Sequence, residues 1–150
     1  MKFTEKMSER LNTLLEKTYD SEKGYLQAMN KVDNTEIKMF FKQTADRRSD
    51  FARDLRREIL SYGEIPEESG TLKGDTQRFW TNIKTLLSGN KEEAVLKECL
   101  KYEKESMEEY DNFLKDQATL PPTTIALLTQ HRNAIQKAIN RAMVYEESVS

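Results

Sequence analysis

Three charged side chains interrupt the apolar stripes of this sequence: Glu22, Arg48 and Glu103. Each stands three or four residues from its stripe neighbours, and residues at such steps share one face of a helix. The spacing therefore places all three side chains in the core of a helical protein. Two carboxylates that face each other in such a core are the beginning of a ferritin-like di-iron site.

A complete site of that kind needs more ligands than this sequence supplies. It takes one Glu from each of two helices and a Glu-x-x-His pair from each of the other two. No Glu-x-x-His occurs in the chain, and Arg48 brings a permanent cation to the same level. We predict a buried ion pair or triad of Glu22, Arg48 and Glu103, with no metal and no other cofactor. Two alternatives stay open: that these residues bind a cation, and that a different helix register leaves them in solvent.

The heights of these residues along the helices support the prediction. Glu22 lies about eleven residues before the first turn, and Glu103 lies about twelve residues after the start of its helix. At ~1.5 Å per residue, these two side chains and Arg48 lie roughly 17–20 Å from the same end. His131, the only histidine, falls a turn or more away. We interpret it as a partly exposed packing residue rather than a ligand.

No other chemistry is indicated, so no catalytic residue is predicted. Cys99 is the only cysteine, and no histidine stands near it in the sequence to activate it. A single histidine gives no credible Ser/His/Asp arrangement, and no glycine-rich phosphate loop occurs. The arginines of 47–57 alternate with aspartates, which is typical of a solvated, salt-bridged helix face.

The elements that position these residues are helices separated by few breakers. Asn34 is expected to cap the second helix, Gly63 to end it, Asn90 with Glu93 to form a capping box, and Pro122 to open the last helix.

The long link 63–90 can return the chain to its starting end. The predicted fold is all-α: a ferritin-like four-helix bundle, with a short extra helix in the long crossover between its second and third helices, in a single domain 1–150. The expected helices span 4–31, 35–62, 76–88, 91–117 and 122–146.

Composition limits the partners. A net charge of −2 argues against nucleic-acid binding. The chain has no long apolar run, so we expect neither a signal peptide nor membrane insertion, and the single cysteine favours the cytoplasm. Three apolar residues lie off the main stripes: Phe3, Leu60 and Met143. Such residues could form an apolar helix face through which the chain forms a homo-oligomer. No small-molecule substrate can be identified.

Several segments resemble an uncharacterised bacterial ferritin-like family of four-helix-bundle proteins, a domain of unknown function, over about residues 8–140. The resemblance implies a ferritin-like bundle with no established activity or cofactor. Many members have a His where this chain has Gln77, and another where it has Ala138 or Ile139. The resembling residues are the segment Tyr19–Tyr25, Phe40, Phe41, Arg48, Phe51, the segment Ser69–Thr71, Arg78, Trp80, Glu98, Cys99, Glu103 and Tyr110.

The leading functional hypothesis is therefore a non-enzymatic, soluble helical-bundle protein with a degenerate ferritin-like metal site and a role in stress physiology. One alternative is a di-iron oxidoreductase or iron-handling protein of the ferritin-like class, which the missing Glu-x-x-His disfavours. The other is a protein-interaction or self-association module that uses an apolar helix face.

Overall fold

We describe a computed structural model of the chain, which covers residues 2–71 and 74–149. Of these described residues, 84% are helical and none lies in a strand. The predicted all-helical class is confirmed, and the predicted helix bounds differ from the observed ones by three residues or fewer. The helices are α1 Phe3–Met29, α2 Thr35–Ser61, α3 Asp75–Ser88, α4 Glu92–Leu114 and α5 Pro122–Val149, with a short 3-10 helix at Gln117–Thr119.

Local chemistry explains most of these bounds. The Asn34 side chain accepts a hydrogen bond from the Ile37 backbone N–H at 3.0 Å, as predicted for the N-cap of α2. Gly63 follows the end of α2 with a φ of 78°, a conformation that glycine adopts without strain. The predicted capping box at Asn90 is wrong. Asn90 has a φ of 55° and lies in the turn that closes α3, so α4 begins without a side-chain cap.

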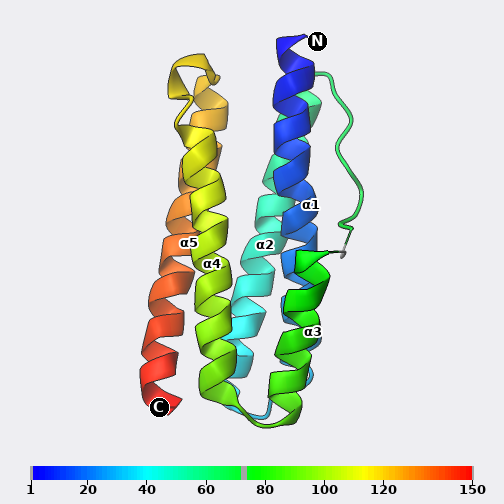
Figure 1. Ribbon diagram of the computed structural model, residues 1–150. Coiled ribbons are helices and arrows are strands. Elements are labelled where there is room, and N and C mark those ends of the chain that lie inside the picture. The colour runs from blue at the N-terminus through cyan, green and yellow to red at the C-terminus, as the bar shows by residue number, and fades with distance from the viewer. Residues whose placement is uncertain (1, 72–73, 150) are drawn as a thin grey trace.

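Four long helices pack side by side, in two antiparallel pairs (Figure 1). The pair α1–α2 and the pair α4–α5 are each joined by a short connection, and α2 also contacts α5. The link after α2 descends along α1, and α3 continues it to the lower end of Figure 1, where α4 starts. The helices before and after the link therefore run in the same direction, which confirms the predicted return of the chain. Residues 72–73 of this link lie outside the described residues.

The link is attached to α1 by polar contacts. Asn12 donates to the carbonyl of Ile65 at 3.1 Å and accepts from the backbone N–H of Glu67 at 2.8 Å. The Tyr19 hydroxyl donates to the carbonyl of Glu67 at 3.0 Å. These bonds pair backbone groups that have no helical partner, so the link follows one defined path along α1.

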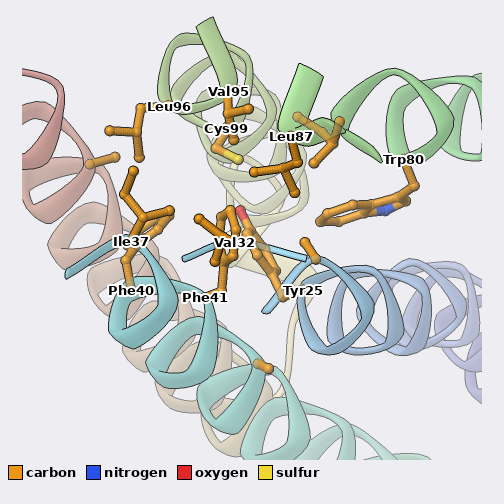
Figure 2. Packing of buried hydrophobic residues seen from close by; sticks show 14 of the residues in the cluster. Tyr25, Val32, Ile37, Phe40, Phe41, Trp80, Leu87, Val95, Leu96 and Cys99 are labelled. Carbon is orange, nitrogen blue, oxygen red and sulfur yellow. The ribbon is translucent and has the colours of Figure 1, made fainter. Parts of the chain in front are cut away.

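The apolar core consists of two clusters, one toward each end of the four helices. The lower cluster contains Tyr25, Phe40, Phe41, Trp80 and Cys99 among its buried members, and Figure 2 shows these side chains meeting from α1, α2, α3 and α4. The upper cluster is built from leucines, isoleucines and aromatic residues of α1, α2, α4 and α5. Between the clusters, along α1, α2 and α4, lie the buried polar residues Thr18, Ser21, Thr44, Arg48 and Glu103.

The apolar surface of each helix is limited to a stripe. Among residues 2–71 and 74–149, no helix combines the length and the apolar character that a membrane crossing requires.

Candidate functional site

Arg48 and Glu103 form a buried ion pair between α2 and α4. Nη2 of Arg48 donates to both carboxylate oxygens of Glu103, each at 2.8 Å. The exposed fractions of the two residues are 3% and 0%. A hydrogen-bonded pair at this depth is shielded from solvent, and loss of either partner would leave an uncompensated charge in the core.

Arg48 and Glu103 belong to a buried polar layer, and the third member of this layer is Tyr25. Its hydroxyl donates to Oε2 of Glu103 at 3.0 Å, so the carboxylate is bound by a cation and a phenol together. The hydroxyls of Ser21 and Tyr102 pair beside it. This role of Tyr25 was not predicted from the sequence. The signal was available, because a buried tyrosine hydroxyl usually finds a hydrogen-bond partner.

Glu22 does not join this layer, contrary to the prediction. It is half-buried, and it lines a surface depression of α1 with Lys23 and Leu26. The buried positions of α1 include 14, 18, 21 and 25, so Ser21 takes the place assigned to Glu22. Adjacent residues point about 100° apart around a helix. A difference of one residue is therefore enough to move Glu22 away from Glu103.

The electrostatics of the layer are dominated by burial and by the ion pair. Burial alone would lower the pKa of Arg48, but the carboxylate of Glu103 and the neighbouring tyrosines together outweigh it, and the pKa lies above its ordinary value. Burial, reinforced by the negative charge of Glu103, raises the pKa of Tyr25 well above its ordinary value. Burial likewise raises the pKa of the Cys99 thiol. The guanidinium is thus fixed as a cation, and the phenol and thiol stay protonated near neutral pH.

A small cavity lies beside Arg48. Its volume is about 20 Å³, and its walls include the polar residues Thr18, Ser21, Arg48, Ser106 and Tyr110. A space of this size with polar groups in its wall accommodates a single water molecule. Three of its lining residues, Lys17, Ser106 and Glu109, also line a groove of about 350 Å³ between α1, α3 and α4.

His131 is a fully buried member of a second polar network, and the prediction of a partly exposed residue is wrong. It is 2% exposed and its ring stacks on Phe51, with the centroids 4.1 Å apart. Nδ1 lies 3.1 Å from the Tyr110 hydroxyl, and Nε2 lies 3.1 Å from Oδ2 of Asp54. Sequence spacing alone missed these partners, because they come from α4 and α2 while His131 is on α5.

This network predicts a pH dependence of stability. Burial lowers the pKa of His131 below its ordinary 6.5, and the Asp54 carboxylate offsets only part of that effect. As pH falls below about 6.5, the unfolded chain takes up a proton at His131 before the folded protein does, so folding loses stability toward acid. Chemical denaturation between about pH 7 and pH 5.5 is expected to show a falling free energy of unfolding. In His131→Gln the slope should be shallower, and an unchanged slope would contradict the assignment.

The residues at the layer do not fit a di-iron centre. Of the two carboxylates predicted for the layer, Glu103 alone lies in the core, and Arg48 binds both of its oxygens. Glu22 lies outside the layer, and His131 is bound to Tyr110 and Asp54. In the part of the chain that the structure describes, no group of three or more His, Cys, Asp or Glu side chains is arranged to hold a metal ion.

The segments singled out in the sequence converge in space. A Cβ atom at Gly24 would lie 2.0 Å from the Trp80 indole, so the ring of α3 packs directly on the α1 backbone. A Cβ atom at Gly70 would lie 1.9 Å from Oδ1 of Asp20, so the link also packs closely on α1. Figure 2 shows Trp80 reaching from α3 to lie beside Tyr25, with ring centroids 4.9 Å apart.

These contacts join α1 to the link and to α3. Residues 6–116, which include most of α1 and all of α2, α3 and α4, match a family model described as Domain of unknown function (DUF2383). The chain belongs to this family. The match ends at residue 116, two residues after α4, which is earlier than the resemblance over 8–140 suggested. Arg48, Glu103 and Tyr25 fall inside it, whereas α5 with His131 lies beyond it. No curated protein matches the chain.

Proposed function

We propose that this DUF2383 chain is a non-enzymatic four-helix-bundle protein of ferritin-like architecture, in which a buried ion pair replaces the metal ions. The return of the link along the bundle supports the ferritin-like connection, since a single long crossover characterises that fold. The observation that carries the proposal is the position of Arg48, whose Nη2 lies 2.8 Å from each oxygen of Glu103.

The physical basis is a competition for one carboxylate. A metal ion binds carboxylate oxygens directly, and a guanidinium donating to both oxygens occupies the same positions. Arg48 remains charged at any physiological pH, and its charge would repel a cation brought next to it. The layer is therefore a structural feature, and the protein acts through its surface. A role in stress physiology in the bacterial cytoplasm is part of this proposal.

Metal analysis of protein purified without added metal tests the proposal. We expect no stoichiometric iron, manganese or zinc in the wild type, and no change in Glu103→Gln. Glu22→Gln is the matched control, since it makes the same chemical change on a half-buried residue outside the layer. Stoichiometric metal that is lost in Glu103→Gln and kept in Glu22→Gln would favour the di-iron alternative and overturn the proposal.

Self-association has weaker support. Phe3, Leu60 and Met143 are 49%, 59% and 48% exposed, so they do lie off the core. Phe3 is the first residue of α1 and Leu60 is one residue from the end of α2, and these two helix ends lie at the upper end of Figure 1. Met143 is six residues from the end of α5, which lies at the lower end of Figure 1. They do not form one patch, and singly exposed apolar residues are common on monomers.

A further inference from the structure

The network of Asp54, His131 and Tyr110 is not used by the proposed function, and its geometry indicates a chemistry of its own. The Asp54 carboxylate can only accept a hydrogen bond, so Nε2 of His131, 3.1 Å away, carries the hydrogen. Nδ1 is then an acceptor, and the Tyr110 hydroxyl at 3.1 Å donates to it. A phenol therefore faces a base that a carboxylate orients, the arrangement by which proteins activate an O–H group.

Nucleophilic attack by Tyr110 is ruled out by its surroundings. The residue is 4% exposed, so a substrate carbon has no access to its oxygen. Burial also raises the pKa of Tyr110, which keeps the phenol protonated. An electron, unlike a substrate, can leave a buried ring without direct contact. The arrangement therefore suits loss of an electron coupled to transfer of the phenolic proton.

We propose that Tyr110 is a proton-coupled one-electron donor, with His131 as its proton acceptor, toward diffusible one-electron oxidants such as peroxyl radicals. In this step the oxidant gains one electron, and a peroxyl radical becomes a hydroperoxide anion. The O–H bond of Tyr110 breaks, and its proton forms an N–H bond at Nδ1 of His131. The products at the site are a neutral tyrosyl radical and an imidazolium.

The charges favour this outcome. Before oxidation the three groups carry the single negative charge of Asp54, and afterwards the imidazolium neutralises it. The imidazolium donates from Nε2 to Asp54 and from Nδ1 to the Tyr110 oxygen, so no new unpaired donor is created. Burial lowers the pKa of His131, which keeps the ring neutral and ready to accept a proton near neutral pH.

Two tyrosines near the ion pair, the buried Tyr25 and the partly buried Tyr102, lack an equivalent acceptor. The Tyr25 hydroxyl donates to Glu103, but that carboxylate is already bound by Arg48, and its protonation would break the ion pair. Within residues 2–71 and 74–149, the Tyr102 hydroxyl is hydrogen-bonded to that of Ser21, which is not a base near neutral pH.

The other three tyrosines also lack a direct base. The Tyr19 hydroxyl donates to a backbone carbonyl and accepts from Arg56. The Tyr62 hydroxyl pairs with that of Thr124. For the Tyr145 hydroxyl, the described part of the chain provides no hydrogen-bond partner. Tyr110 is thus distinguished among the six tyrosines by a neutral imidazole acceptor.

Flash-generated tris(bipyridine)ruthenium(III), with persulfate as the electron acceptor, tests the proposal on the full chain. We expect a tyrosyl radical in electron paramagnetic resonance that is lost in Tyr110→Phe and kept in the matched control Tyr102→Phe. In His131→Gln, oxidation should slow on the order of 10²-fold, the usual contribution of a positioned base. The wild type should also oxidise more slowly in deuterated water.

Asp54→Asn provides an independent variant, since Asp54 is partly exposed and its loss leaves the core packing intact. An asparagine amide that donates to Nε2 places the hydrogen on Nδ1, and this removes the acceptor for Tyr110. We expect the same slowing as in His131→Gln, with an unchanged circular dichroism spectrum. A radical that persists in Tyr110→Phe, or an oxidation rate unaffected by Asp54→Asn, would overturn the proposal.

Discussion

Arg48→Met is expected to lower the free energy of unfolding by about 3–5 kcal/mol near neutral pH, the usual cost of removing one partner of a buried ion pair. The substitution leaves Glu103 at 0% exposure, with Tyr25 as its remaining donor. Methionine fills a similar space, so the loss reflects charge rather than a cavity. Chemical denaturation of the wild type and the variant measures it.

A solvated arginine would behave differently, since its removal would cost under about 1 kcal/mol. A loss of that size would contradict the burial of Arg48 in an ion pair.

Gly24→Ala is expected to destabilise the protein, although the same change inside a helix ordinarily stabilises it by roughly 0.5–1 kcal/mol. The added Cβ atom would lie 2.0 Å from one ring carbon of Trp80 and 2.3 Å from a second. The ring is 4% exposed and contacts the rings of Tyr25, Phe79 and Tyr102, so it has little room to move. Overpacking of this kind costs about 1–3 kcal/mol, occasionally more.

Gly89→Ala is the matched control for this effect. A Cβ atom there would meet its nearest neighbours at 3.7 Å, an ordinary contact distance, and the φ of −92° suits any residue. We expect a change within about 0.5 kcal/mol, as is usual for surface substitutions. Equal effects at Gly24 and Gly89 would show that the contact with Trp80 is not tight, whereas Trp80→Leu should relieve the cost of Gly24→Ala.

The helices were predictable because each carries one apolar stripe, and because recognisable residues such as Asn34 and Pro122 mark where α2 and α5 begin. The ion pair of Arg48 and Glu103 followed from the same stripes together with the length of the link, which set both residues at one height. These features depend on local spacing and chain length. Both can be read from one sequence.

The errors arose where tertiary contacts decide between local options. Steps of three and four residues allow either Ser21 or Glu22 to follow Thr18 on the α1 stripe, and the Tyr102 hydroxyl on α4 selects Ser21. His131 stands at core spacing between Leu128 and Ile135, yet its burial depends on partners from two other helices. The sequence offers no local signal for such partners.

A double-mutant cycle on Arg48 and Glu103 tests the central claim most directly, because it isolates the interaction between the two residues. The four proteins are the wild type, Arg48→Met, Glu103→Gln and the double variant, with Glu22→Gln as the control outside the layer. We expect each single change to be costly, the double variant to recover much of the loss, and a coupling energy of up to about 3 kcal/mol. Glu22→Gln should leave the free energy of unfolding nearly unchanged. Small and additive losses at Arg48 and Glu103 would contradict a buried ion pair at the centre of this protein.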